Sequence, residues 1–248
     1  KDKDPDVCVW CEGQANYVTN TADDLPDDPD KYLYGLWKDL SARYGHKYVA
    51  FSGRRDRYAQ VVTSKYPIGT VAQIVGEAPD SVVTHGCGWF TLERGGKTVN
   101  IVTLHTWPMR FRFGAADREA SAAVREGDLY RRMEIQYICE HTILSVEGAR
   151  DQYWMMMGDF NSRSRRDNYI YKHPDTDSRF LVQDYIYGCT PYLDVMGCLY
   201  PGKFITTTGG ESRIDFLYCT KPLFDSIVSA EVVSDSYTTP VRDPQKQN

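Results

Sequence analysis

The chain has 248 residues, of which 42% are hydrophobic and 25% are charged, and its formal net charge is −5. This ordinary globular composition excludes the disordered, collagen-like and coiled-coil classes. The acidic balance excludes a protein held to nucleic acid by bulk positive charge, and no apolar run approaches the ~18 residues that span a membrane.

The N-terminal segment begins KDKDPDV, with neither an initiator Met nor a signal peptide, which is typical of a trimmed or processed chain. The missing signal peptide therefore does not determine the cellular compartment, and we expect an exported protein rather than a cytoplasmic one. The apolar run VCVWC (7–11) predicts a strand that ends at Glu12. Cys8 and Cys11 would face opposite sides of it, so they cannot share one metal, and buried free thiols are the better interpretation.

A helix is expected next, with Asp28 as N-cap, Pro29 in the first turn and Gly45 at its C-terminus. Its apolar residues Leu33, Leu36, Trp37 and Leu40 are spaced by three and four. A series of predicted strands follows, and Gly95-Gly96 between the last two predicts a hairpin turn. These strands cover 47–53, 58–64, 71–77, 81–93 and 97–107.

A long helical stretch is predicted over 116–146, and Gly127 is a candidate break within it. We expect its apolar face to be formed by Leu129, Met133, Tyr137 and Leu144. The strand YWMMM (153–157) then ends abruptly in GDFN. A helix over Leu181–Tyr187 and two strands, 212–220 and 226–234, complete the predicted elements.

Two predicted strands indicate the fold class. NIVTL (100–104) and YWMMM (153–157) are apolar on both faces, which places them in the middle of a covered sheet. Strands dominate, with helical stretches inserted between strand groups. We therefore predict an α/β (α+β) fold of two mixed sheets packed face to face with helices outside, formed as a single domain over residues 1–248.

Polar residues stand where several of these strands end or join a loop: Glu12, His105, Asp159 with Asn161, and Asp215. A buried carboxylate costs several kcal/mol unless it is paired or binds a metal, so the set suggests convergence at one rim. Each residue has a simpler interpretation. Glu12 could be an exposed strand end and His105 a core histidine; Gly158-Asp159 could be a plain turn and Asp215 a partner of Arg213.

Four motifs occur in one order: SKYPI (64–68), TLHTW (103–107), GDFNS (158–162) and RIDFLY (213–218). They resemble those of the endonuclease/exonuclease/phosphatase superfamily. The resemblance implies a DNase I-like four-layer sandwich. It also implies a divalent-metal-dependent hydrolase of phosphodiester or phosphomonoester bonds, with Mg²⁺ or Mn²⁺ as cofactor.

The resemblance also implies a role for each residue of the rim. Glu12 would be the metal ligand, and His105 would contact the phosphate. Asp159 would orient or activate the attacking water, Asn161 would bind phosphate, and Asp215 would support the catalytic His. The roles suit the chemistry, because Mg²⁺ prefers oxygen ligands and phosphoester hydrolysis needs a cation, a positioned water and an acid or base.

Two family elements have no counterpart. The family begins with an Asn-bearing strand before the Glu, whereas eleven residues without Asn precede Glu12; it ends in S-D-H, whereas no His follows His173. Either Ser236 in SDSYTTPV (234–241) replaces the His, or the S-D-H lies beyond Asn248. We favour the second reading, with the first and last strands of the domain missing, and expect little hydrolase activity from the chain as written.

The fold does not select the substrate, which could be a phosphorylated small molecule, a lipid headgroup or nucleic acid. Arg163 and Arg165 in SRSRR (162–166) are predicted to bind phosphate, the alternative being a solvated loop. One rival function is a non-catalytic relative that binds a phosphate or glycan ligand. Another is a glycosidase that uses two carboxylates without metal. We expect a monomer without a transmembrane segment.

Overall fold

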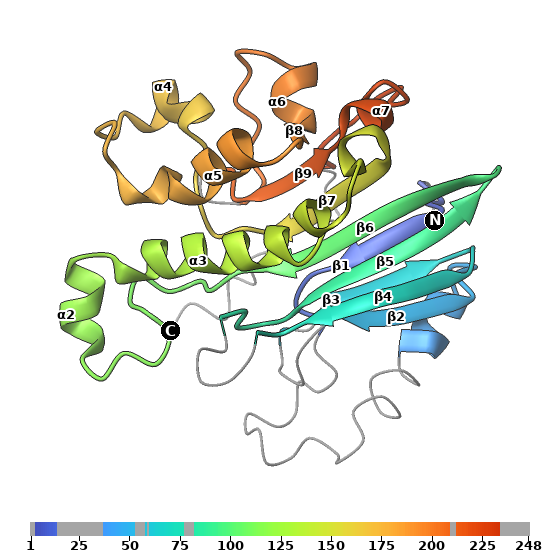
Figure 1. Ribbon diagram of the computed structural model, residues 1–248, viewed down its shortest axis with the longest axis horizontal. Helices are drawn as coiled ribbons and strands as arrows, with labels where there is room; N and C mark the ends of the chain where they lie inside the picture. The colour runs from blue at the N-terminus through green and yellow to red at the C-terminus, as the bar shows by residue number, and fades with distance from the viewer. Residues whose placement is uncertain are drawn as a thin grey trace, which may run out of the picture.

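The computed structural model describes residues 3–13, 37–52, 58, 60–76, 82–208 and 212–233. Two sheets form its centre (Figure 1). The smaller has the order β1-β3-β2 and the larger β4-β5-β6-β7-β9-β8. The strands are β1 Val7–Trp10, β2 Tyr48–Ser52, β3 Gln60–Ser64, β4 Ile68–Ile74, β5 Cys87–Arg94, β6 Lys97–His105, β7 Tyr153–Asp159, β8 Leu193–Asp194 and β9 Asp215–Cys219.

The strands β6 and β7 lie side by side in the interior of the larger sheet and run parallel. Val102 and Met156 belong to the core on the helix side, whereas Ile101 and Met155 belong to the core shared with the smaller sheet. Both strands are thus covered on both faces, as their continuous apolar runs predicted. The predicted two-sheet architecture with outer helices is confirmed.

The hairpin between β5 and β6 turns at Gly95 and Gly96, whose φ angles are 57° and 72°. Two consecutive positive φ angles define the type I′ geometry that matches the twist of the flanking strands. The predicted turn is confirmed. It fixes the register that carries β6 to His105.

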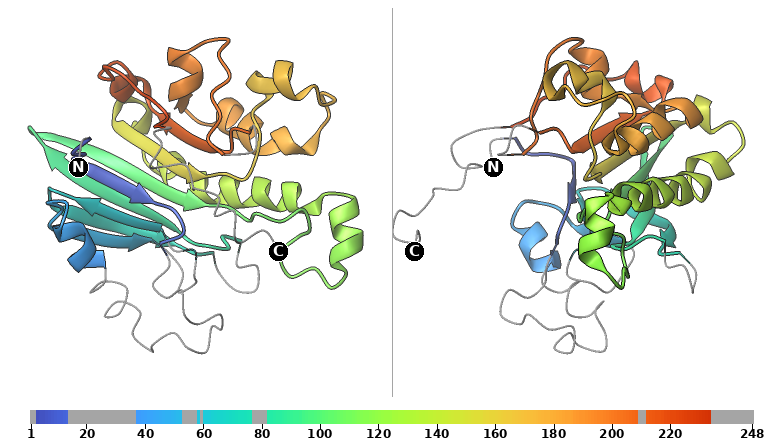
Figure 2. Two further views of the ribbon diagram at one scale, coloured as in Figure 1. Left: turned by 180° about the vertical axis from the view of Figure 1, so that it is seen from behind. Right: turned by 90° about the vertical axis from the view of Figure 1, so that its left-hand side faces the viewer.

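Helices cover the outer face of the larger sheet, where α3 (Glu126–Glu140) packs against α5 (Leu181–Cys189) (Figures 1 and 2). Residues 37–42 are helical and lie on the outer side of the smaller sheet, which gives four layers. The predicted caps Asp28 and Pro29 lie outside the described residues, while Gly45 has the positive φ of a helix end. The other helices are α2 Arg118–Ala123, α4 Asn168–Tyr171, α6 Val195–Leu199 and α7 Lys221–Phe224, with single turns η2 Ile143–Ser145, η3 Ala149–Asp151, η4 Arg165–Asp167 and η5 Ser178–Phe180.

The predicted apolar face of the long helix is wrong at Leu129, Met133 and Leu144, whereas Tyr137 packs against the core as predicted. Leu129 is 54% exposed and Met133 46% exposed. The buried face instead combines apolar residues with charged ones that find partners inside the protein, and this displaces the apolar stripe. Its members include Asp128, Arg131, Glu134, Ile135, Ile138 and Cys139.

The break in this helix also differs from the prediction. It falls at Arg125, which has a φ of 56°, and not at Gly127. Gly127 serves a close approach, because a Cβ there would lie 2.1 Å from the carbonyl oxygen of Met109. The missing side chain therefore lets the preceding loop pack against α3.

The last predicted strand, 226–234, is wrong over its described part. Residues 226–233 form no strand, and Val228 is 99% exposed. These residues pair with no strand in the described part of the chain, so their β-branched composition has no sheet to join. Within the described residues, no helix has both the length and the apolar character needed to cross a bilayer.

Candidate functional site

Three of the predicted site residues form a row across the larger sheet. His105 is in register with Asp159 on β7, and Asp159 is in register with Asp215 on β9. Side chains alternate along a strand, and the neighbours of this row, Leu104 and Phe216, face the helix side. The row therefore faces the smaller sheet, at the end where β6 and β7 finish and β9 begins.

Glu12 reaches this row from the other sheet. It follows β1 with a φ of 54°, and its side chain is 53% exposed. Nε2 of His105 lies 3.9 Å from Oε1 of Glu12 and 3.8 Å from Oδ2 of Asp159, while the His105 side chain is only 2% exposed. The structure thus brings all four residues together at one rim between the sheets.

The GDFN turn owes its geometry to glycine and to two hydrogen bonds. Gly158 has a φ of 147°, and a Cβ there would lie 1.8 Å from the carbonyl oxygen of Leu104. The backbone N–H of Asn161 donates to Oδ1 of Asp159 over 2.7 Å, and its Nδ2 donates to the carbonyl oxygen of Thr106 over 3.0 Å. These bonds hold the amide and the carboxylate side by side.

The electrostatics of the rim are those of crowded carboxylates. Burial, together with the charges of Asp215 and Glu12, raises the pKa of Asp159 from 3.8 to about 7, while Arg131 acts in the opposite direction. Burial also raises the pKa of Asp215, and Glu12 adds to that effect. A bound cation would relieve this repulsion, and carboxylate oxygens are the ligands that Mg²⁺ accepts.

The donor set therefore fits a hard divalent cation that keeps part of its water shell. Among the described residues, no three His, Cys, Asp or Glu side chains are arranged to hold one ion by themselves. Mg²⁺ commonly binds through one or two carboxylates and several waters, so the two observations agree.

A second layer of residues behind His105 was not predicted from the sequence. The ring of His85 lies 4.7 Å from that of His105. The fully buried Glu134 accepts hydrogen bonds from the backbone N–H groups of Thr84 (2.9 Å) and Trp107 (2.8 Å) and from the Thr84 hydroxyl. Glu134 thus ties the loop of His85 to the loop after His105. A polar residue in a helical pattern gives no sequence signal of such a contact.

The ion-pair interpretation of Asp215 is wrong. Arg213 forms a bidentate pair with Asp194, at 3.0 and 2.8 Å, and also contacts Asp167 at 2.9 Å. The backbone N–H of Asp215 donates to the hydroxyl of Thr207 over 3.1 Å. Arg213 is therefore structural and, against the effect of burial, the hydrogen bonds and charges of its two carboxylate partners raise the pKa of its guanidinium.

The two arginines after GDFN have different surroundings. Arg165 forms a bidentate pair with Asp184, at 3.2 and 2.7 Å. Arg163 lies over the ring of Tyr171 at 4.5 Å and contacts His173. Neither makes a contact with the carboxylates of the rim, so their binding of phosphate stays a prediction.

Cys8 and Cys11 face opposite sides as predicted, but neither is a fully buried residue, since Cys8 is half-buried and Cys11 is exposed. Cys8 lines a cavity of about 640 Å³ on the outer side of the smaller sheet, whereas Sγ of Cys11 lies 3.9 Å from the carbonyl oxygen of Leu104 between the sheets. Burial of its thiol raises the pKa of Cys11, although the residue as a whole is exposed. Both cysteines are free, and they face opposite sides of the strand. Ser236 lies outside the described residues.

Comparison with known proteins gives one family match. The model of the Endonuclease/Exonuclease/phosphatase family matches residues 1–237. No protein with curated annotation matches the chain significantly.

Solved structures share the fold at low sequence identity. An AP endonuclease from Archaeoglobus fulgidus is 16% identical with a TM-score of 0.55, over 90% of this chain and 79% of that one. The 3′ phosphatase NExo from Neisseria, bound to a product DNA hairpin, is 12% identical with a TM-score of 0.53, over 89% and 78%. The human nocturnin catalytic domain with a bound sulfate anion is 12% identical with a TM-score of 0.52, over 88% and 70%.

Proposed function

Because the chain belongs to the endonuclease/exonuclease/phosphatase family, a family of phosphoester hydrolases, we propose that it is a divalent-metal-dependent hydrolase of phosphoester bonds. One observation carries the proposal. His105, Asp159 and Asp215 form a row across three neighbouring strands and face Glu12 on the other sheet. This geometry supports the proposal, because a metal ligand, a proton acceptor and a hydrogen-bond donor to phosphate would have to lie within one small volume.

Glu12 is the proposed ligand of Mg²⁺ or Mn²⁺, with Asp159 and Asp215 close enough to add to the negative charge that attracts it. When bound, the cation would neutralise phosphate oxygens and so stabilise the charge that develops during hydrolysis. Half of the Glu12 side chain is exposed, which leaves it accessible to a hydrated ion.

Asp159 is the proposed acceptor of the proton from the attacking water. The pKa of about 7 belongs to the cation-free protein, and a bound cation would lower it, so that Asp159 is ionised and can accept a proton near neutral pH. Oδ1 of Asp159 accepts the hydrogen bond from the Asn161 N–H. Oδ2 of Asp159, which lies on the side of His105, is therefore the oxygen directed into the site. This fixed orientation would hold the water at one angle to the phosphorus atom.

Asn161 and His105 are the proposed donors to the phosphate. The Asn161 amide carries two N–H groups, and one of them donates to Thr106, which leaves the other for a phosphate oxygen. Nε2 of His105 lies 3.9 Å from Oε1 of Glu12 and 3.8 Å from Oδ2 of Asp159, so an N–H on this nitrogen would point into the rim, where it could donate to a phosphate oxygen. Both groups are fixed before substrate arrives, which is the condition for effective electrostatic stabilisation.

The test is hydrolysis of a panel of phosphomonoesters and phosphodiesters, with EDTA and with Mg²⁺ or Mn²⁺. We expect low rates, because none of the five histidines follows residue 173 and the family's terminal S-D-H has no counterpart. The activity should nevertheless be abolished by EDTA and by Asp159→Ala. Asp225→Asn, an exposed carboxylate on the surface beyond α7, is the matched control and should leave the rate unchanged.

Metal-dependent hydrolysis that survives Asp159→Ala would contradict the assigned proton acceptor. Absence of any EDTA-sensitive hydrolysis, together with tight phosphate binding at the rim, would support the non-catalytic binding protein instead. Hydrolysis of glycosides without metal would support the glycosidase.

A further inference from the structure

Two arginines meet at one histidine beyond the rim. Nη1 of Arg163 and Nη1 of Arg179 each lie 2.5 Å from Nε2 of His173. The three residues come from the segment after GDFN, from the loop that follows α4 and from η5. The backbone N–H of Arg163 donates to the carbonyl oxygen of Arg179 over 3.0 Å, which fixes the two arginines relative to each other.

Arg163, Arg179 and His173 together offer more hydrogen-bond donors than acceptors. An imidazole nitrogen has a single lone pair, so it can accept one good hydrogen bond, while each guanidinium carries five N–H donors. Burial and the charges of Arg179 and Arg163 lower the pKa of His173, which keeps the ring neutral and accepting. At least one guanidinium edge is therefore left to bind another acceptor.

The surroundings are also positively charged. Arg179 is 3.3 Å from Asp177, but no carboxylate in the described part of the chain lies within ion-pair distance of Arg163. The neighbouring Asp128 is shared by Arg125 and Arg131. The guanidinium groups of Arg125, Arg163 and Arg179 therefore lie near two carboxylates, Asp177 and Asp128, and Asp128 is also paired with Arg131. Burial and the nearby Arg125 and Arg163 lower the pKa of Arg179, as expected where cations crowd together.

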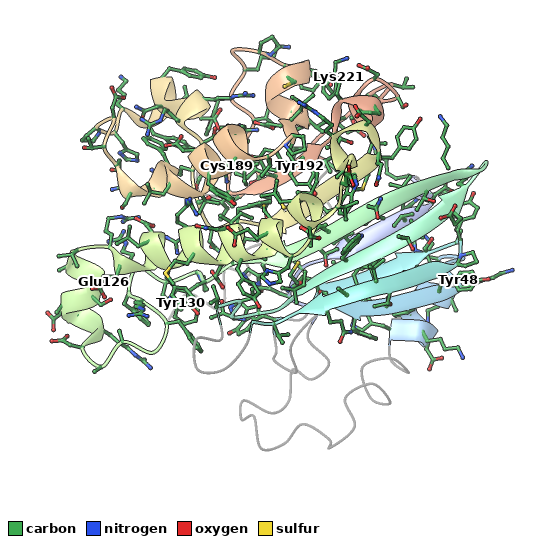
Figure 3. All side chains as sticks on the ribbon, viewed as in Figure 1. Tyr48, Glu126, Tyr130, Cys189, Tyr192 and Lys221 are labelled. Atoms are coloured by element: carbon green, nitrogen blue, oxygen red, sulfur yellow. The ribbon has the colours of Figure 1, made fainter. Side chains whose placement is uncertain are left out.

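The group lies next to the rim. Arg163 follows Asn161 by two residues, so their Cα atoms are no more than about 7 Å apart. Glu126 and Tyr130 mark the beginning of α3 in Figure 3. Arg125, at the N-cap of this helix, is near enough to Arg179 to lower its pKa, and Arg131, in the second turn, is near enough to Asp159 to lower the pKa of that carboxyl. A ligand that reaches these arginines from the rim would have to be an extended one, such as a substrate with two phosphate groups.

Guanidinium groups recognise phosphate through paired N–H donors, and an anion here would complete the hydrogen bonds and neutralise the excess charge. We propose that Arg163, Arg179 and His173 form a second anion site, which binds a second phosphate group of the substrate. The role as a substrate subsite rests on the proposed function. Arg165 does not belong to it, because Asp184 already occupies its guanidinium in a bidentate pair.

The kinetic test compares substrates that differ by one phosphate. The p-nitrophenyl ester of thymidine 5′-phosphate is compared with its 3′-phosphorylated form, and inositol monophosphate with inositol bisphosphate. The second phosphate should raise kcat/KM about ten- to hundredfold, as expected for one or two charge-assisted hydrogen bonds. A gain in the nucleotide pair alone identifies a nucleic-acid backbone as the source, and a gain in the inositol pair alone identifies a small phosphorylated alcohol.

Arg163→Met and Arg179→Met should each reduce that gain to below about threefold. Arg150→Met is the matched control, because this exposed arginine precedes β7 at the strand end opposite Asp159, and the gain should persist there. An equal gain in wild type, Arg163→Met and Arg179→Met would overturn the proposal. The proposal would also be overturned if Arg150→Met reduced the gain as much as Arg163→Met and Arg179→Met do.

A binding measurement keeps the site testable apart from catalysis. Inorganic pyrophosphate is titrated into the ¹⁵N-histidine-labelled protein in EDTA, and the ring nitrogens of His173 are followed by NMR. Saturable shifts that Arg179→Met weakens at least tenfold support the site even if no substrate is hydrolysed, in which case only the proposed function fails. Absence of a saturable His173 shift in the wild-type protein would overturn the anion site itself.

Discussion

Replacing Asp159 by asparagine should stabilise the cation-free protein at high pH while removing its activity. The carboxylate is 20% exposed and lies beside two other carboxylates, so its charged form is disfavoured in the folded protein. Asparagine has the same shape and keeps an Oδ1 that can accept from the Asn161 N–H. The substitution therefore removes the charge without removing the hydrogen bond.

The magnitude follows from the pKa of Asp159, which rises from 3.8 to about 7 on folding. A folded-state pKa above the unfolded one gives a stabilisation that is complete below pH 3.8 and is lost as the pH rises through about 7. At about 1.36 kcal/mol for each pKa unit, ionising Asp159 costs roughly 4 kcal/mol above that range. Solvent screening reduces this, and we expect Asp159→Asn to gain roughly 2–3 kcal/mol at pH 8.5.

The assay is urea unfolding in EDTA at pH 5 and pH 8.5, for wild type, Asp159→Asn and the surface control Asp225→Asn. The gain should fall from roughly 2–3 kcal/mol at pH 8.5 to roughly 1 kcal/mol at pH 5, where the unfolded carboxylate is already ionised but the folded one is not, and the control should show no gain at either pH. When Mg²⁺ replaces EDTA, it should stabilise wild type more than Asp159→Asn, because the cation offsets the repulsion between the rim carboxylates that the variant already lacks. A variant that is no more stable than wild type at pH 8.5 would refute the reasoning.

Four further substitutions test the packing around the rim and on α3, each by urea unfolding. Arg213→Met should destabilise by roughly 3–5 kcal/mol, because it leaves two buried carboxylates unpaired; a loss below about 1 kcal/mol would contradict this. Gly158→Ala should cost at least about 3 kcal/mol, since its Cβ would overlap the neighbouring strand, and wild-type stability would show that β6 and β7 are not so close. Ile135→Ala should cost roughly 2–5 kcal/mol and Leu129→Ala less than about 0.5 kcal/mol, whereas the sequence-based helix face requires the reverse order.

The centre of the fold could be predicted from the sequence because its signals are local. Apolar residues on both faces of 100–104 and 153–157 place these strands inside a covered sheet, and polar residues at the ends of buried strands mark the rim. Glu12, His105, Asp159 and Asp215 were found for that reason, helped by the resemblance of their motifs to a known family.

What could not be predicted depends on contacts between distant segments. Glu134 looks like a solvent-facing helix residue until Thr84 and Trp107 donate to it. The same holds for Arg179 and His173, whose meeting with Arg163 no spacing in the sequence indicates. Periodicity also failed for α3, because buried charged residues take places that a hydrophobic pattern assigns to apolar side chains.

Isothermal titration of the protein with Mg²⁺ or Mn²⁺, repeated with Glu12→Gln, tests whether the rim holds a metal ion. We expect one saturable site in wild type, competition by EDTA, and at least about tenfold weaker binding in Glu12→Gln, because a neutral amide replaces the proposed carboxylate ligand. Binding that Glu12→Gln leaves unchanged, or no binding in wild type, would contradict a metal site at this rim.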